Sequence, residues 1–287
     1  MIEVANEEEL FKEIRNAYIG RKKISIVGSG SHSDKKGEVI STIKMNSFDI
    51  KGDIIEAYAG ASVLKIREEA SSYGYLFPTL YDGTIGGLLG INYVSPLSTF
   101  YGTPRDFTLW CRAITPYGGL NWKIFIGSKG LIGAISKAVM KLFPRPYKIV
   151  TLEKSYDSVN ELLDDYIKLK ENKPIATLVE YEKTYKIHFT YAFDPDITGF
   201  NKDDGVPFIE ESDKNSYIVE TPSLSEFIKL VEKTNPIYAY TVINSGFSKV
   251  YLADEDILAD FNYYPYNGVK GIYLKLKKLL DYRNIFE

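Results

Sequence analysis

The distribution of glycine between Pro78 and Pro146 constrains the fold more than any other feature. Glycines gather in two bursts, which comprise Gly83, Gly86, Gly87, Gly90 and Gly102, then Gly127, Gly130 and Gly133. Glycine belongs where φ must be positive or where a partner approaches too closely for a Cβ. The segments 107–114 and 131–143 are rich in β-branched and aromatic residues and predict buried strands. The pattern favours strands joined by connections that hold backbone N–H groups against a phosphate or a flat ring. For any single glycine, a tight turn is the alternative.

Composition limits the class of protein. The 287 residues are enough for two domains, and 45% hydrophobic with 25% charged residues is typical of a globular protein. A net charge of −3 disfavours nucleic-acid binding. One cysteine and two histidines exclude an internal disulfide and a Cys/His metal site, so no metal is expected. Cys111 lies in a predicted strand, which indicates a buried structural residue.

Targeting signals are not expected from this sequence. The N-terminal segment is acidic and amphipathic and has no apolar core typical of a secretory signal. No apolar run reaches the roughly 18 residues that a membrane span needs, so no transmembrane segment is predicted. We therefore expect a cytoplasmic protein.

A loop rich in glycine and serine follows the first clear strand. A helix over 6–19, with Asn6 as its N-cap, precedes a strand over 24–27 that leads into Gly28-Ser29-Gly30-Ser31-His32-Ser33. Such a loop presents N–H groups and hydroxyls to a phosphate. Ser33 stands where the dinucleotide fingerprint needs its third glycine, and the Gly-Lys-Ser/Thr ending of a Walker loop is missing. A phosphate loop of another class and a plain turn both remain open.

The next elements exclude a doubly wound sheet. Strands are predicted over 39–45 and 54–58, followed by a helix over 63–73 that Ser62 caps and Gly74 ends. The order of helix, strand, loop, strands and helix is an α+β pattern without strict alternation.

The pattern of predicted elements changes after Pro144-Arg145-Pro146, which we take as the domain boundary. Strands are predicted over 149–152, 176–181, 184–193, 217–220, 238–243 and 249–252, and helices over 159–169, from 224, and after 269. Ser223 and Glu226 form a capping box at the start of the second helix. A polar loop is expected over 194–215. This order of βαββ followed by βαββ predicts an antiparallel sheet with helices on one face.

Several short motifs occur together in a familiar order. These are the loop after the first strand, Ala59-Gly60-Ala61, Gly74, Pro78, Thr84-Ile85-Gly86-Gly87, Tyr101-Gly102-x-x-Arg105-Asp106 and Gly127-Ser128-x-Gly130-x-x-Gly133. Together they resemble the FAD-linked oxidases of the vanillyl-alcohol oxidase and p-cresol methylhydroxylase (PCMH) type, and the small E subunit of bacterial glycolate oxidase looks closest. The likeness covers about residues 1–150. The last residues, 280–286, also look like the Asp-Pro-x-x-Ile-Phe-Asn tail of many members, with Tyr282 in place of the proline.

The resemblance implies an α+β fold with two domains. Residues 1–146 would form a PCMH-type FAD-binding domain made of two α/β subdomains. Residues 147–287 would form a short antiparallel α+β cap domain on the substrate side. Such a cap is as short as in the small subunit of glycolate oxidase.

The resemblance also implies FAD as the cofactor and a set of contacting residues. The loop would wrap the pyrophosphate, the middle motifs would line the extended cofactor, and the last turn and its strand would carry backbone contacts. The implied residues are Gly28, Ser29, Gly30, Ser31, His32, Ser33, Pro78, Thr84, Ile85, Gly86, Gly87, Gly90, Asn92, Tyr101, Gly102, Arg105, Asp106, Gly127, Ser128, Gly130, Gly133 and Ile135. A valine at Gly86 or Gly30 is expected to exclude the cofactor and to leave a folded core.

Two departures from the family pattern affect these expectations. Some relatives bind flavin covalently through a histidine in a Gly-Gly-His-Ser context, and His32 has Ser31 in place of one glycine, so covalent attachment and an ordinary loop histidine are both open. The Lys-Asn-x-x-Gly-Tyr-Asp-Leu motif of the glycolate oxidase subunits is missing before Gly127. That motif walls part of the flavin site, so the pocket would be open or covered by a partner subunit.

The resemblance implies an oxidoreductase subunit that oxidises a small 2-hydroxy acid such as glycolate or lactate by hydride transfer to flavin, with partner oxidase subunits. The sequence assigns no catalytic residue. His188 lies on the strand face opposite Ile187 and Phe189, which favours an outward or satisfied histidine over a base. The alternative is a companion subunit of the same fold that stabilises an oxidase complex without flavin. A cell-wall UDP-sugar reductase ranks last, because its acid pair cannot be placed.

Overall fold

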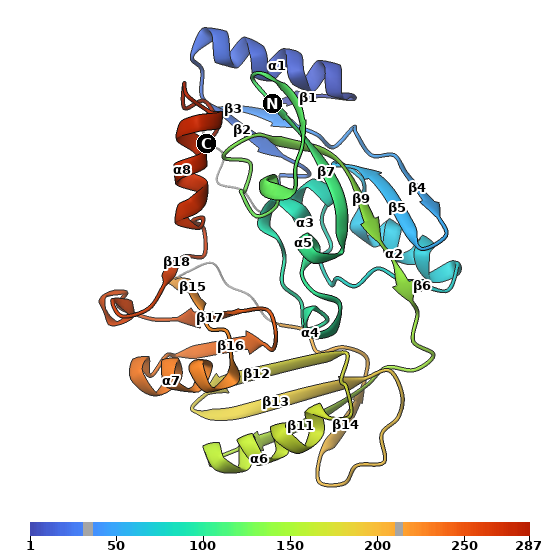
Figure 1. Cartoon of the computed structure of the whole chain (residues 1–287), viewed down its shortest axis with the longest axis vertical. Helices are drawn as coiled ribbons and strands as arrows, with labels where there is room; N and C mark the ends of the chain where they lie inside the picture. The colour runs from blue at the N-terminus through green and yellow to red at the C-terminus, as the bar shows by residue number, and fades with distance from the viewer. Residues whose placement is uncertain (31–36, 210–214) are drawn as a thin grey trace. The chain divides into compact units, whose positions relative to one another are not determined.

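The structure is a computed structural model that describes residues 1–30, 37–209 and 215–287 (Figure 1). The chain forms two compact units, each made of separate stretches of sequence. Unit 1 contains residues 1–93, 104–145 and 269–287, and unit 2 contains residues 94–103 and 146–268. The division into domains at residue 146 stays a prediction. The two units are described separately below.

The first part of unit 1 is a small parallel sheet with a helix. Its strands are β1 (Ile2–Glu3), β3 (Glu38–Ser41) and β2 (Ile24–Val27), in that spatial order. The helix α1 (Glu7–Gly20) buries Leu10 and Ile14 in the same apolar cluster as strand residues of this sheet. Asn6 caps α1 as predicted, because its Oδ1 accepts the Glu9 N–H at 2.9 Å. At the other end Arg21, and not Gly20, takes the left-handed conformation, with φ of 54°.

The second part of unit 1 is a five-stranded antiparallel sheet. The strands run β4 (Phe48–Lys51), β5 (Ile54–Tyr58), β9 (Ala134–Lys141), β7 (Thr108–Thr115) and β8 (Gly118–Asn121) across the sheet. The helices α2 (Val63–Ser72) and α3 (Ile85–Ile91) contribute to the same core, and β6 (Tyr75–Leu76) pairs with β10 (Phe143–Pro144). Two short segments follow α3 and β8, namely α5 (Pro104–Phe107) and a 3₁₀ turn over Lys123–Phe125. Two α/β subdomains were expected, and this pair of sheets with helices matches them.

The segment after Thr84, for which the sequence predicts no secondary structure, forms the short helix α3. Thr84 caps α3, since its Oγ1 accepts the Gly87 N–H at 3.3 Å. Glycines have low helix propensity, but the burial of Ile85, Leu88 and Leu89 compensates for it. The strand expected from Leu131 also begins later, at Ala134. It is preceded by a turn in which Gly127, Lys129 and Gly130 have positive φ.

Unit 2 is built on an eight-stranded antiparallel sheet. Across the sheet lie β14 (Asn201–Asp204), β11 (Val150–Tyr156), β13 (Thr184–Tyr191), β12 (Ala176–Glu182), β16 (Tyr238–Val242), β17 (Phe247–Tyr251), β15 (Ser216–Glu220) and β18 (Tyr263–Pro265). The helices α6 (Val159–Lys170) and α7 (Leu224–Thr234) pack on one face, where both contribute to a single core (Figure 1). This confirms the predicted antiparallel sheet with helices on one face.

The order of strands in unit 2 shows an internal repeat. The segment β11-α6-β12-β13 and the segment β15-α7-β16-β17 have the same order, and each places its last strand between the other two. The halves join through the antiparallel pair β12 and β16. Ser223 caps α7 as predicted, with the Glu226 N–H at 3.3 Å from its Oγ. The polar segment around 201–204 forms an edge strand, β14, where a loop was expected.

Candidate functional site

The loop after β2 lies against the start of α3 in unit 1. A Cβ built on Gly28 would overlap the Oγ1 of Thr84, so the Gly28 backbone lies directly against the Thr84 side chain. The Oγ of Ser41 donates to the Gly28 carbonyl at 2.8 Å and fixes the beginning of the loop. Gly30 has φ of 78°, a conformation that favours glycine. Ser31, His32 and Ser33, which the sequence assigns to the cofactor, lie outside the described residues.

The turn before β9 lies against the end of α3. The Gly127 N–H donates to the Leu89 carbonyl at 2.9 Å, and the Lys129 N–H donates to the Gly90 carbonyl at 2.8 Å. A Cβ on Gly130 would lie 3.8 Å from the Cβ of Ile26 in β2. Three glycine-rich segments, 28–30, 84–92 and 127–133, are therefore brought together in unit 1.

Asn92 connects this region to the Arg105 segment. It ends α3 in a left-handed conformation with φ of 52°, and its Oδ1 accepts the Arg105 N–H at 2.9 Å. The Arg105 guanidinium donates to the Ile126 carbonyl and to the hydroxyl of Tyr273, at 2.5 Å in the second case. Tyr273 belongs to α8 (Gly271–Leu280), so the C-terminal helix reaches this region of unit 1. Sequence patterns did not indicate Tyr273.

Most of these glycines are explained by contacts within unit 1. A Cβ on Gly86 would lie 3.1 Å from both the Cβ and the carbonyl oxygen of Ala59, and one on Gly87 would overlap the hydroxyl of Tyr81. A Cβ on Gly133 would lie 3.0 Å from the ring of Phe125. A valine at Gly86 would therefore press against Ala59, and the expectation that it leaves a folded core stays a prediction.

Gly90 is different. No heavy atom of the described residues would lie within 4 Å of its Cβ beyond the neighbouring backbone of its own helix. Its φ is not positive, so the backbone does not need glycine there. Inside a helix, glycine costs about 1 kcal/mol relative to alanine. The protein interior gives no reason for this cost, and the open space at Gly90 suits the close approach of a ligand.

The other predicted residues are distributed as follows. Pro78, Ile85, Ser128 and Ile135 are buried, Asp106 is exposed, and Tyr101 and Gly102 lie in unit 2, at the end of α4 (Ser98–Tyr101). The Oγ of Ser128 donates to the Phe125 carbonyl at 2.7 Å, so this hydroxyl serves the turn itself. Contacts from these residues to a cofactor stay predictions.

The electrostatics of the three segments favour an anion. None of the segments 28–30, 84–92 and 127–133 contains Asp or Glu. Burial raises the pKa of the Cys111 thiol to about 11, while the charges of Arg105 and Lys123 oppose this rise. Arg105 and Lys123 thus contribute positive charge beside this region. A dianionic pyrophosphate needs hydrogen-bond donors without nearby carboxylates, so the residues present fit it.

His188 in unit 2 is the second residue that the sequence singled out for chemistry. It is 6% exposed, and its Nε2 lies 2.6 Å from the Oε2 of Glu180, while its Nδ1 lies 3.3 Å from the Oε2 of Glu153. Tyr238 donates its hydroxyl to the other oxygen of Glu180. The prediction of a satisfied strand histidine is confirmed. Because both ring nitrogens face carboxylates, His188 is poorly suited to accept a substrate proton.

Metal sites and membrane spans were also sought. Over residues 1–30, 37–209 and 215–287, no group of three His, Cys, Asp or Glu side chains is placed to hold a metal ion. Within the same ranges, the helices are too short or too polar to cross a membrane.

Comparisons with known proteins define the class. Residues 1–122 match the FAD binding domain family FAD_binding_4. Two solved structures of alkyldihydroxyacetonephosphate synthase superpose with TM-scores of 0.65 and 0.66 at 14% identity, and each covers 99% of this chain and about three quarters of the synthase. The fold is that of PCMH-type FAD-binding proteins. The chain carries an FAD-binding domain, and FAD is the cofactor it indicates.

Two relatives are also found by sequence similarity. The chain is 24% identical over 184 residues to D-lactate dehydrogenase of Archaeoglobus fulgidus and 21% identical over 192 residues to D-lactate dehydrogenase of Anaerostipes hadrus. Each match covers 57% of this chain and 40% of the relative. The chain therefore spans well under two thirds of the length of these relatives.

Proposed function

We propose that this chain is the FAD-binding subunit of an oxidoreductase that oxidises a small 2-hydroxy acid such as glycolate or lactate. The observation that carries the proposal is the similarity to two D-lactate dehydrogenases, in a chain whose first 122 residues match an FAD binding domain. When bound, FAD supplies the hydride acceptor. The likeness to the E subunit of glycolate oxidase and a cytoplasmic location belong to the same proposal.

The residues proposed to hold the cofactor are those that the sequence resemblance implies, and the geometry of unit 1 supports some of them. The backbone of Gly28, Ser29 and Gly30 would face the pyrophosphate, together with Ser31, His32 and Ser33 of the sequence. Gly90 would lie beside the extended cofactor, because its surroundings leave room there. Arg105 would keep the Gly127 turn in place through the Ile126 carbonyl. These roles are binding and orientation.

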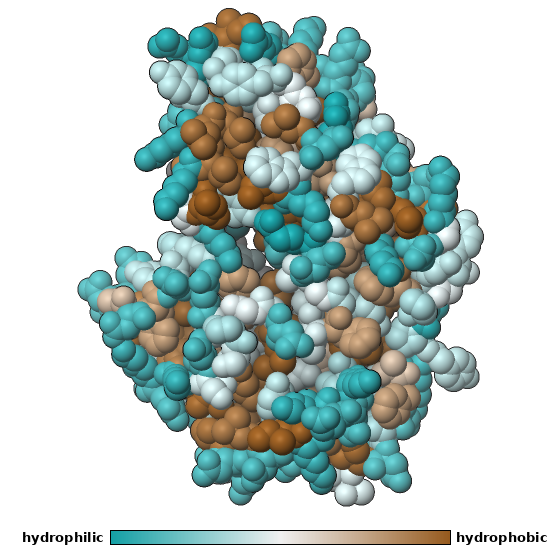
Figure 2. Space-filling model, in the orientation of Figure 1, coloured by the Kyte–Doolittle hydropathy of each residue, from teal (hydrophilic) through white to brown (hydrophobic). Residues whose placement is uncertain are grey.

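Two observations support a subunit rather than a self-sufficient enzyme. The segment that walls the flavin site in the glycolate oxidase subunits is missing before Gly127. On α8, the apolar side chains of Ile272, Leu274 and Leu279 are 51%, 52% and 74% exposed, and Figure 2 shows apolar residues gathered over this helix. Exposed apolar residues that gather on a surface are typical of a protein interface.

The alternative is a companion subunit of the same fold that stabilises an oxidase complex without flavin. The acid-free glycine segments and the open space at Gly90 favour the flavin-binding subunit. The satisfied state of His188 favours the companion, since a catalytic base would need a free ring nitrogen.

A visible absorbance spectrum of the purified protein, before and after acid precipitation, separates these functions. Flavin bands released into the supernatant support bound FAD, and bands that stay in the pellet indicate a covalent link, for which His32→Ala is the test. Bleaching of the bands by D-lactate or glycolate, with the partner subunits present, would support the proposed reaction. A colourless protein that takes up no added FAD would favour the companion.

A further inference from the structure

The C-terminal tail of unit 1 connects two segments of the candidate site. We propose that residues 281–287, together with Lys277, are a positioning element that holds β2 and the Gly127–Gly133 turn in register for the cofactor. The proposal rests on the assignment of these two segments to FAD. The main residues of this element, Asp281, Ile285 and Phe286, are buried and need not touch the cofactor.

The tail extends the small parallel sheet at the edge formed by β2. The Ile24 N–H donates to the Ile285 carbonyl at 2.8 Å, and the Glu287 N–H donates to the Ile24 carbonyl at 2.9 Å. Ile24 and Phe286 thus form a parallel bridge. Ile285 and Phe286 are each 1% exposed and belong to the core of this sheet. Because β2 leads directly into Gly28, the tail fixes the strand that presents the loop.

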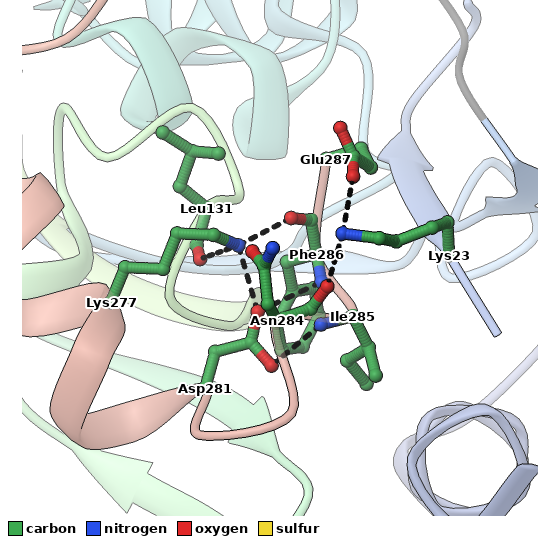
Figure 3. Close-up of polar contacts among 8 residues, drawn as sticks. All are labelled: Lys23, Leu131, Lys277, Asp281, Asn284, Ile285, Phe286 and Glu287. Atoms are coloured by element: carbon green, nitrogen blue, oxygen red, sulfur yellow. Dashed lines mark hydrogen bonds and ion pairs between the residues drawn. The ribbon is translucent and has the colours of Figure 1, made fainter. Parts of the chain in front are cut away.

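A buried carboxylate shapes the tail. The side chain of Asp281 is fully buried, and its two oxygens accept the N–H groups of Ile285 at 2.8 Å and of Phe286 at 2.9 Å (Figure 3). Lys277, one turn earlier on α8, pairs with Asp281 at 2.7 Å. Every charge in this cluster therefore has a partner, and the chain reversal after α8 is held by side-chain to backbone bonds.

Lys277 carries the connection to the second segment. Its Nζ donates to the Phe286 carbonyl and lies 3.4 Å from the Leu131 carbonyl, which is part of the Gly127–Gly133 turn (Figure 3). At the start of the same helix, the Tyr273 hydroxyl donates to the Ile126 carbonyl, next to Gly127. The helix α8 is thus bound to both ends of the turn region, and its tail is bound to β2.

The chemistry of the cluster fits a positioning role better than a stabilising one. A buried ion pair adds little net stability, because desolvation offsets the attraction. Directed bonds from one carboxylate and one ammonium group to three backbone positions instead specify geometry. A ligand that contacts β2 and the turn at once binds more tightly when both are already in place. Loss of the cluster should therefore weaken FAD binding.

The test compares two neighbouring lysines of α8. Lys277→Met and Asp281→Asn remove the cluster, and Lys278→Met is the matched control, because Lys278 is exposed on the same helix. FAD affinity is measured by flavin fluorescence quenching at a temperature where far-UV circular dichroism shows each apo-protein to be folded. We expect Kd to rise about tenfold in the first two variants, as for the loss of preorganised backbone, and to stay unchanged in the control.

Binding of two further ligands, ADP and riboflavin, distinguishes a positioning role from a general loosening of the fold. ADP should lose affinity along with FAD, because it carries the pyrophosphate, whereas the affinity for riboflavin should change much less. If Asp281→Asn does not fold, deletion of Glu287 alone decides, since it removes the N–H bond to Ile24 and the ion pair with Lys23 without changing Lys277 or Asp281.

The outcomes distinguish this inference from the proposed function. Unchanged FAD affinity in Lys277→Met and in the Glu287 deletion would overturn the positioning role while leaving the proposed function intact. An equal loss of ADP and riboflavin affinity would also overturn it. If the unmodified protein binds no FAD, the proposed function fails first, and with it the inference.

Discussion

The polar groups of the two units are arranged in opposite ways. In unit 1, three glycine-rich segments come together without a single Asp or Glu, and Gly90 has open space around its Cβ position. In unit 2, His188 pairs with Glu153 and Glu180 on the sheet face opposite Ile187 and Phe189. The first arrangement suits an external anion, whereas the His188 cluster satisfies its own hydrogen-bonding groups.

The difference concerns where function can reside. A site made of backbone N–H groups needs a close approach of the ligand, which a Cβ blocks. In the sequence such a site therefore appears as a pattern of glycines. A side-chain site needs a group with unmet hydrogen-bonding capacity, and His188 has none to spare. We infer that unit 1 carries cofactor binding and that the His188 cluster of unit 2 serves structure. The predictions below test this division.

The largest expected effect is the loss of FAD binding in Gly90→Phe. Because no heavy atom of the described residues lies within 4 Å of a Cβ at this position, beyond the backbone of its own helix, we expect the fold to tolerate the larger side chain. We expect a fall in FAD affinity of at least about 100-fold, because a cofactor cannot share that space. Titration followed by flavin fluorescence measures it. Leu64→Phe, on the exposed side of α2 in the same unit, is the control and should bind FAD normally. Normal binding by Gly90→Phe would remove Gly90 from the site.

A smaller effect is expected for His188→Gln in unit 2. The shorter amide cannot reach both carboxylates as the imidazole does, so one of them loses a hydrogen-bond partner, and we expect the free energy of unfolding to fall by about 1–3 kcal/mol. Urea denaturation at neutral pH measures this change. FAD affinity should be unaffected. If His188→Gln were fully stable but unable to oxidise substrate, the division between the units would be wrong. The exposed pair Lys51 and Asp49 is the control, and its removal should change stability little.

The same cluster predicts a pH dependence. Burial raises the pKa of Glu180, but hydrogen bonds from His188 and Tyr238 more than offset this, so its pKa in the folded protein lies below the ordinary value. A carboxyl group with a lowered folded pKa stabilises the protein above its unfolded pKa of about 4.3, and this contribution is lost as pH falls through the folded value. Unfolding curves between neutral and acidic pH should show this loss in the unmodified protein and a weaker one in Tyr238→Phe. Equal pH profiles would contradict the role of Tyr238.

The smallest effect is expected at Cys111 of unit 1. Its side chain is buried and burial raises its pKa to about 11, so little thiolate, the reactive form, exists near neutral pH. Iodoacetamide should leave the folded protein unmodified and should label it once urea has unfolded it, as mass spectrometry would show. Labelling of the folded protein as fast as free cysteine would contradict this prediction. It would place a reactive thiol near the site and add it to the candidate chemical groups of unit 1.

Local signals in the sequence predicted much of the fold. The capping roles of Asn6, Ser62 and Ser223 follow from side chains that bond the first turn of their own helices, which needs no knowledge of distant residues. The alternation around His188 placed it opposite Ile187 and Phe189, and the order of elements gave the antiparallel sheet of unit 2.

Features that depend on distant contacts could not be predicted. Glycines at 86, 87 and 90 argue against a helix, and only the burial of Ile85, Leu88 and Leu89 makes α3 form. The strand β14 consists of four exposed polar residues and has no apolar alternation to reveal it. No local pattern shows that Tyr273 and Asp281 pack within unit 1, because their partners lie more than 100 residues away or arise from the chain reversal.

Hydrogen exchange of the apo-protein with and without FAD tests the central claim most directly. The claim is that the backbone of unit 1 holds the cofactor, so added FAD should slow amide exchange in peptides that cover the loop after β2, the end of α3 and the Gly127 turn. Exchange in the peptides of β12 and β13 around His188 should change little. Protection confined to unit 2, or no protection in these three segments under conditions where FAD is bound, would contradict the account.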